Sequence, residues 1–283
     1  RLLSAVVAAC LIFGAAAAVP QNAFTDMASV TASAAYVQGD FEYVPSSNGK
    51  FAMVTKYKNT TSTSCTIPDK LGNMPVEVIA QDAFKGNTKL TTVTVPKSLR
   101  VISVSAFEGC TALTVVSELR NTQLTNVDKY AFKDCTAMKN INFPKTLQAF
   151  GVGAFENCTS LEAVIGLQNT KLSGQLYSTF KGCKKLTSIQ FPEGVGYMYQ
   201  AFQNCEALQG ISLPDSITTI SDYTFSGCTN LTSVKMPANL EKLGDYAFYD
   251  CKTLQGEYML RGTKLKTVGE HCFTNCILLK KIA

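Results

Sequence analysis

Tryptophan is absent from the chain, and histidine occurs only once, at His271. One ring cannot supply a metal site built from several histidines, and the only possible imidazole base of a triad lies at a variable position of the chain, so a structural role is favoured for His271. The cysteines form no Cys-x-x-Cys pair, and no glycine-rich phosphate loop is present. Paired carboxylates for acid–base chemistry stay open, but the acids fall mostly at variable positions. We predict no enzyme activity, no metal and no cofactor.

Clustered charge is also lacking. The 26 basic residues exceed the 21 acidic ones by a net charge of +5, and the longest basic runs are the pairs 184–185 and 280–281. Nucleic-acid binding usually requires a basic face, so we expect no nucleic-acid partner. The 46% of hydrophobic residues is enough to form a large core.

The first residues have the composition of an export signal. Residues 2–19 are almost wholly apolar, follow Arg1, and become alanine-rich before Pro20. We therefore predict a signal peptide and flexible lead-in over 1–35, with cleavage sites at 16–18 or 32–34. An uncleaved membrane anchor is the alternative, since about 17 apolar residues nearly span a bilayer. A lipidated Cys10 is a third possibility, disfavoured by the apolar residues after it.

What the chain does have is a repeat. Phenylalanine recurs every 22–25 residues, at positions 84, 107, 132, 155, 180, 202, 225, 248 and 273. Around each one a similar frame returns, as in residues 106–113 and 224–231. An alternating segment ending in Pro often follows, as in 91–96 and 188–192. Self-similarity at a period of 20–50 residues indicates a solenoid.

The frame predicts two kinds of local structure. Ala, Phe, Cys and Leu at offsets 0, 1, 4 and 7 share one face of a helix, so a short helical turn is expected there. The period then changes to two, as at Val93 and Val95, which predicts a strand that Pro terminates. One copy cannot bury enough apolar surface to fold alone, so neighbouring copies must stack, with parallel strands on one face.

Three copies are longer and carry a related phrase in place of Pro, at 119–124, 167–172 and 260–265. Spacings of 23 and 25 residues alternate at first, which indicates duplication of a two-repeat unit. Before the first copy, residues 41–44 and 51–54 flank Asn48-Gly49, which predicts a hairpin that covers the end of the stack. The expected organisation is a hairpin cap over 36–64 and a solenoid over 65–283, cut at its C-terminal end because residues 279–283 stop in mid-pattern.

The motif A-F-x-x-C-x-x-L-x-x-[IV]-x-[LFIV]-P resembles the BspA-like leucine-rich repeats over residues 65–283. The resemblance implies a curved α/β solenoid in a secreted or cell-surface protein that binds extracellular proteins or glycans, with host matrix proteins among the expected partners. Asn87 departs from the family pattern where Cys is expected. The resemblance specifies the repeat class but no ligand.

Eight cysteines occupy one repeat slot, at 110, 135, 158, 183, 205, 228, 251 and 276. We interpret them as small buried side chains that pack in the core. Disulfides between stacked copies remain open, because a shared slot does not guarantee the geometry that a bridge needs. Oligomeric state is not predicted.

Strand residues between the core positions should point outward and form a binding face. The candidates are Thr92, Thr94, Asn140, Asn142, Ser188, Gln190, Ser212, Ser233 and Lys235. Because hot spots usually contain aromatic anchors, Tyr197, Tyr199 and Tyr258 are added to them. We predict a non-enzymatic adhesion or binding module, with a structural spacer or the targeting array of a larger enzyme as alternatives.

Overall fold

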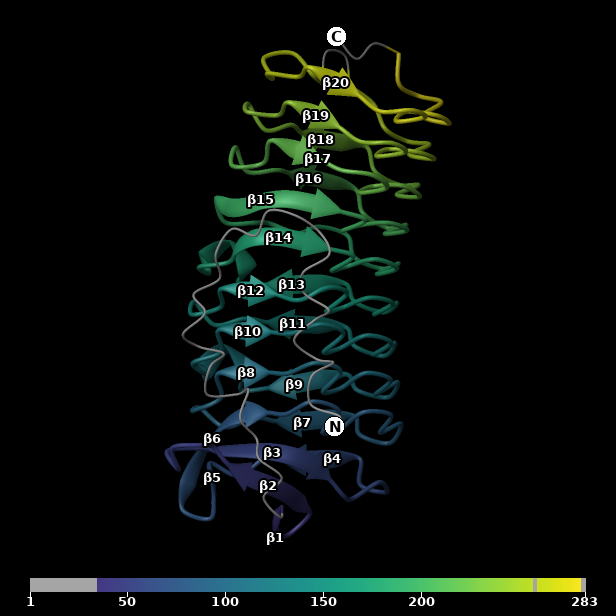
Figure 1. Cartoon of the computed structure of the whole chain (residues 1–283). Helices are drawn as coiled ribbons and strands as arrows, with labels where there is room; N and C mark the ends of the chain where they lie inside the picture. Colours follow the sequence, from purple (N-terminus) through teal and green to yellow (C-terminus); the bar gives the residue numbers. More distant parts are fainter. Residues whose placement is uncertain (1–34, 257–258, 281–283) are drawn as a thin grey trace, which may run out of the picture.

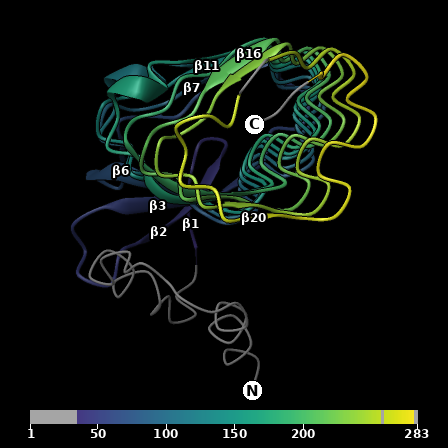
Figure 2. The same cartoon turned by 90° about the horizontal axis from the view of Figure 1, so that it is seen from above.

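The computed structural model describes residues 35–256 and 259–280, and in it the chain winds into a rod of stacked coils (Figure 1). Seen along the rod, each coil has parallel strands on two opposite sides and a tight run of turns on a third side (Figure 2). Successive coils follow nearly the same path, so equivalent residues lie above one another along the rod.

One side carries the strands that lead into the Pro segments, and we call its outward surface the Pro face. Its members are β4 (Ser64–Thr66), β7 (Thr92–Thr94), β9 (Val115–Ser117), β11 (Asn140–Asn142), β13 (Ala163–Ile165), β16 (Gly210–Ser212) and β18 (Ser233–Lys235). All pairs within it are parallel. The middle residue of each strand is buried and its two neighbours face outward, as the alternation predicts.

The opposite side carries a second set of strands, and we call its outward surface the Tyr face. It contains β1 (Tyr36–Gln38), β2 (Phe41–Pro45), β3 (Ala52–Tyr57), β6 (Met74–Ile79), β8 (Val101–Ile102), β10 (Asn126–Val127) and β12 (Ala149–Phe150). A separate sheet continues it with β14 (Ser173–Tyr177), β15 (Gly194–Tyr199), β17 (Thr219–Ile220), β19 (Lys242–Leu243) and β20 (Thr267–Val268). A short strand, β5 (Lys70–Leu71), pairs antiparallel with β6.

The predicted helical turns around the phenylalanines are wrong. These segments are consecutive β-turns in which backbone N–H groups alternate between two partners. Glu108 N donates to Ser105 O within the coil, at 3.1 Å, whereas Phe107 N donates to Ala131 O of the next coil, at 2.8 Å. A helix would direct both groups to partners four residues back, so this segment joins coils instead of closing on itself.

The physical reason is a pair of left-handed residues in each copy. One lies two residues before the phenylalanine and the other two residues after it, at φ between 51° and 76°. The second position is occupied throughout by Gly, Asn or Asp, namely Gly86, Gly109, Asp134, Asn157, Gly182, Asn204, Gly227, Asp250 and Asn275. These residue types tolerate positive φ, which a type II turn requires and an α-helix excludes.

The core is one continuous stack. Phe107 and Phe132 are stacked with ring centroids 5.2 Å apart, and similar contacts link successive copies from Phe84 to Phe273. Aromatic pairs at such separations add about 0.5–1.5 kcal/mol each beyond the area that they bury. The interior that sequence periodicity predicted is therefore present, and no single copy encloses it.

Each cysteine of the repeat slot has a hydrogen bond as well as a packing role. Cys110 Sγ donates to Phe84 O of the preceding coil at 3.1 Å, and the other seven slot cysteines repeat this contact at 3.1–3.2 Å. Asn87, which replaces cysteine in the first copy, keeps the arrangement because its Nδ2 donates to Asn59 O at 3.2 Å. All ten cysteines of the described residues are free thiols.

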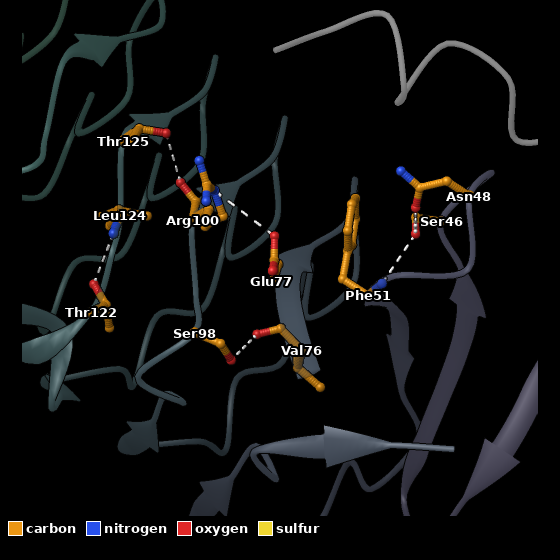
Figure 3. Close-up of polar contacts among 10 residues, drawn as sticks. All are labelled: Ser46, Asn48, Phe51, Val76, Glu77, Ser98, Arg100, Thr122, Leu124 and Thr125. Atoms are coloured by element: carbon orange, nitrogen blue, oxygen red, sulfur yellow. Dashed lines mark hydrogen bonds and ion pairs between the residues drawn. The ribbon is translucent and has the colours of Figure 1, made fainter. Parts of the chain in front are cut away.

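Side chains also connect neighbouring coils near the N-terminal end (Figure 3). Ser98 Oγ donates to Val76 O at 2.7 Å, and Thr125 Oγ1 donates to Arg100 O at 3.2 Å. Thr146 and Ser216 occupy the position of Ser98 in their copies, two residues after Pro, and make the equivalent bonds to Leu124 O and Val195 O. Short hydroxyl side chains at the two positions, that of Ser98 and that of Thr125, therefore help to fix the register between coils.

A hairpin lies at the N-terminal end of the rod (Figure 1). Strands β2 and β3 pair antiparallel, and β3 pairs parallel with β6, which joins the hairpin to the first coil. Ser46 Oγ accepts from Phe51 N and donates to Asn48 Oδ1, which holds the loop (Figure 3). Tyr57 stacks on Phe84 at 5.2 Å, so the hairpin covers the end of the phenylalanine stack.

Candidate binding surfaces

The Pro face holds most of the residues predicted to bind a ligand. Strand registers place Thr92 beside Val115, Asn140 beside Ala163, and Ser233 beside Gly210. Isolated bridges add Ser188 beside Ala163 and Gln190 beside Ser212. Together these contacts place nine candidates on one side of the rod, namely Thr92, Thr94, Asn140, Asn142, Ser188, Gln190, Ser212, Ser233 and Lys235.

This face is not one continuous sheet. It divides into β4-β7-β9, β11-β13 and β16-β18, and the backbone bonds of the described residues include none between β9 and β11. The interruption follows a longer copy. Glu118, at φ 65°, turns the chain away from the sheet immediately after β9. Strands β9 and β11 still lie next to each other, but no backbone hydrogen bond joins their facing edges.

The longer copies place a short arm immediately after β9 and after β13. The arms are the 3-10 turns η3 (Leu119–Asn121) and η4 (Leu167–Asn169). Thr122 Oγ1 donates to Leu119 O at 2.7 Å and accepts from Leu124 N at 3.2 Å, the latter contact shown in Figure 3; Thr170 does the same in the second arm. The Leu-x-Asn-Thr phrase of the longer copies thus encodes a fixed arm.

A hollow of about 230 Å³ lies at the first interruption. Its lining comes from three segments: strand β9, the first arm, and strand β11, over residues 115–120 and 140–142. Drug-sized ligands usually occupy pockets of about 300–1,000 Å³, so this hollow fits a side chain of a larger partner better than a free cofactor. The candidates Asn140 and Asn142 both line it.

Sequence reasoning missed the apolar part of this face. Val115, beside the hollow, is 40% exposed, and Ile165, on β13, is 46% exposed. Both occupy outward strand positions that are polar in most copies, such as Thr92 and Gln190. A comparison of outward positions between copies, instead of within one copy, is the signal that identifies them.

The Tyr face carries two of the other candidates. Tyr197 and Tyr199 lie on β15 of that sheet, on the side opposite the Pro face, and Tyr177 of β14 lies beside them. The sequence did not single out Tyr177, although Tyr177 and Tyr199 both precede a repeat phenylalanine by three residues. Tyr258 lies outside the described residues.

Few of the described residues have side chains suited to catalysis or metal binding. Burial raises the pKa of the Cys110 and Cys272 thiols to about 12 and raises that of the Cys228 thiol further. His271 stacks on Tyr246 at 5.0 Å between ring centroids. Within residues 35–256 and 259–280, no group of His, Cys, Asp or Glu has the arrangement of a metal site, and no helix is long and apolar enough to cross a membrane. The Pro face and the Tyr face can therefore contact a partner through their shape, their hydrogen-bonding groups and their apolar side chains.

Stacked coils of similar length, parallel strands and a continuous interior define a leucine-rich-repeat solenoid. The chain belongs to the family described as the BspA-type leucine-rich repeat region of six copies, whose model matches residues 54–178 and again residues 174–280. No curated protein matches the chain.

Solved structures are similar over most of the chain. A leucine-rich repeat protein of T. pallidum is 24% identical, over 83% of this chain and 99% of that one, with a TM-score of 0.58, which shows the same fold. A leucine-rich cell surface protein of Faecalibacterium prausnitzii is 19% identical over 89% and 95% of the two chains, with a TM-score of 0.43. The pneumococcal vaccine antigen PcpA is 18% identical over 88% and 85%, with a TM-score of 0.41.

Proposed function

We propose that this protein is a non-enzymatic binding module, secreted or held at the cell surface, that recognises an extracellular protein through its Pro face. The observation that carries the proposal is the hollow between β9 and β11, where the sheet is interrupted beside an arm. Membership of the family and the export-like composition of residues 1–35 support the location.

The surface suits a protein partner for three reasons. Val115 and Ile165 offer exposed apolar contact, while Asn140 and Asn142 offer amide donors and acceptors that match a peptide group. The unpaired edges of β9 and β11 add backbone groups of the kind that extended peptides pair with. No outward residue of the seven Pro-face strands is aromatic, so the face lacks a platform on which a sugar ring can stack.

The test is binding of the purified protein to immobilised host matrix proteins, measured by biolayer interferometry. Asn142→Arg should fill the hollow and weaken capture about tenfold or more, as expected for a central contact. Thr267→Arg adds the same side chain to an exposed position on the other sheet and should leave capture unchanged.

A combined substitution of Thr94, Asn142 and Lys235 by alanine tests the whole face. If a matrix protein is captured equally by this variant, the Pro face is not the binding surface. If no matrix protein is captured by the unaltered protein either, the result favours the alternative of a spacer without a specific ligand. The third alternative, a targeting array of a larger enzyme, predicts an adjoining catalytic domain in the full-length gene.

A further inference from the structure

We propose that the Tyr face holds a second site, built from Tyr177, Tyr197 and Tyr199, that binds an uncharged sugar ring of a glycan. The site is distinct from the hollow on the Pro face, because its residues lie on the opposite sheet of the rod. It goes beyond the proposed protein-binding function and does not depend on it.

The site lies where the strands of the Tyr face are longest in this part of the rod. Strands β14 and β15 pair parallel over five positions, with an irregularity between Gly174 and Gln175. Leu176 and Met198 point into the core and are fully buried. The tyrosines at the neighbouring positions therefore stand on the outward side, each of them half-buried.

The floor beside these tyrosines is bare backbone. A Cβ added to Gly174 would meet nothing within 4 Å, and one added to Gly196 would meet nothing closer than 3.9 Å. The positive φ of Gly174, 87°, further favours glycine there. A flat ligand can therefore lie directly against the sheet at these two residues, with the tyrosine rings beside it.

The rings of this cluster do not cover one another. Tyr177 is tilted by 49° to Tyr197 and by 52° to Tyr199, with centroids 5.6 and 6.3 Å apart. By contrast, Tyr223 and Tyr246 lie parallel within 1° at 5.0 Å, so each ring occupies a face of the other. Only the tilted cluster leaves ring faces available for the C–H face of a pyranose, which is apolar.

The hydroxyl groups of the cluster are held at fixed positions. Tyr197 Oη donates to Ser221 Oγ at 2.9 Å, Gln200 Nε2 donates to Tyr199 Oη at 3.4 Å, and Tyr177 Oη donates to Gln175 Oε1. Each phenol oxygen still has acceptor capacity, and the Gln175 amide retains its donors. Sugar hydroxyls can pair with such groups without reorganising them, which lowers the entropic cost of binding.

The charge pattern indicates an uncharged ligand. The outward residues of β14 and β15, and Thr219 beside Tyr197, are all neutral. At the position three residues before the repeat phenylalanine, the copies on either side of Tyr177 and Tyr199 carry Val152 and Asp222. Neither residue is a cation that would pair with a sulfated or acidic sugar, and Asp222 would repel such a sugar, so neutral hexoses fit best.

The experiment is isothermal titration calorimetry of the protein with three neutral sugars, cellohexaose, maltohexaose and hexa-N-acetylchitohexaose. We expect at least one of them to bind, and Tyr197→Ala or Tyr177→Ala to weaken it about tenfold or more, as for other aromatic anchors. Tyr197→Phe should weaken it less, because the ring remains. Tyr246→Ala is the matched control, since it removes a tyrosine whose faces are already covered, and it should not alter binding.

The test of sugar binding at the Tyr face can be distinguished from the test of protein binding at the Pro face. Asn142→Arg should leave sugar binding unchanged, so that loss of matrix-protein capture alone identifies the hollow. Absence of heat with all three sugars, or equal binding by Tyr177→Ala and Tyr197→Ala with unchanged melting curves, overturns the proposal. If these two variants instead lose matrix-protein capture while no sugar binds, the cluster is a protein hot spot and the glycan assignment is wrong.

Discussion

At the scale of single residues, the repeat phenylalanines and the repeat cysteines contribute to the core in different ways. Phe155 is fully buried between Phe132 and Phe180, and it also makes edge contacts with Phe143 and Phe150. The slot cysteines lie in the same interior, and their thiols satisfy phenylalanine carbonyl groups of the preceding coil. A phenylalanine therefore contributes buried area, and a cysteine contributes a small volume with one hydrogen-bond donor.

Phe155→Ala should open a void in the middle of the stack. Large-to-small changes of this kind cost about 3–5 kcal/mol in free energy of unfolding, and the four aromatic neighbours of Phe155 cannot all move inward. Chemical denaturation should show the loss, with Val152→Ala, an exposed change in the same copy, as the control. An unshifted transition for Phe155→Ala would contradict its place in the core.

The slot thiols from Cys110 to Cys228 should be unreactive in the folded protein. Because burial raises the pKa of Cys110 to about 12, almost no thiolate exists at this residue at pH 8. An aromatic disulfide reagent should therefore react with these cysteines only after denaturant is added. Rapid labelling of the native protein at Cys110 would show that the slot is open.

The raised pKa of Cys110 also makes the free energy of unfolding depend on pH. An unfolded cysteine ionises near pH 9, whereas folded Cys110 stays protonated up to about pH 12. Between these values the unfolded state releases the proton first, so the free energy of unfolding should fall as the pH rises. Melting curves recorded at pH 8 and pH 10.5 measure the difference, and Cys110→Ala should reduce it.

The carboxyl group of Asp128 predicts that the stability of the protein also depends on pH in the acidic range. Burial raises the pKa of this half-buried carboxyl from 3.8 to about 6, so the folded state holds its proton more tightly than the unfolded state. Its contribution to stability is full below pH 4 and declines as the pH rises to 6. Asp128→Asn should therefore raise the melting temperature at pH 7.5 and change it little at pH 4, and equal effects at both values would exclude the mechanism.

At the scale of elements, the strands could be predicted and the turns could not. Alternation at Val93 and Val95 identified a strand because side chains on a sheet have a period of two. The spacing of Ala, Phe, Cys and Leu matched a helix, but four inward side chains can also come from consecutive turns. The Gly, Asn or Asp two residues after each phenylalanine was the available signal, since it marks positive φ.

The candidate sites were predictable only in part. Asn140 and Asn142 follow from alternation along one strand, whereas the hollow depends on the missing pairing between β9 and β11. The tyrosine cluster depends on a second sheet and on the register between β14 and β15. Such relations between copies arise from the packing of coils and are not encoded in any one of them.

The turn geometry yields a prediction of its own. Gly227 has φ 76°, and an added Cβ would overlap Oδ1 of Asn204. Gly227→Ala should lower the free energy of unfolding by about 1 kcal/mol or more, from positive φ and from the overlap together. Gly196→Ala is the control, because its Cβ meets nothing closer than 3.9 Å and should leave the unfolding curve unchanged.

At the scale of the whole molecule, the rod has an end that must be covered. The hairpin of β2 and β3 places Tyr57 on Phe84 and adds strands to the Tyr face. Deletion of residues 36–57 should expose the first coil, lower the melting temperature and increase binding of a hydrophobic dye. Deletion of 36–38 alone removes an exposed strand and should have little effect. Equal stability of the two deletions would show that the hairpin does not protect the core.

The arms of the longer copies recur at a regular pitch. The arm η3 follows β9 and the arm η4 follows β13, so they are two coils apart. With about 4.8 Å between neighbouring strands, this separation is roughly 10 Å. Each further duplication of the two-copy unit would add one arm at the same interval. Gene duplication could then raise the valency of the rod stepwise, and a partner with matching spacing would gain avidity without any change to an individual contact.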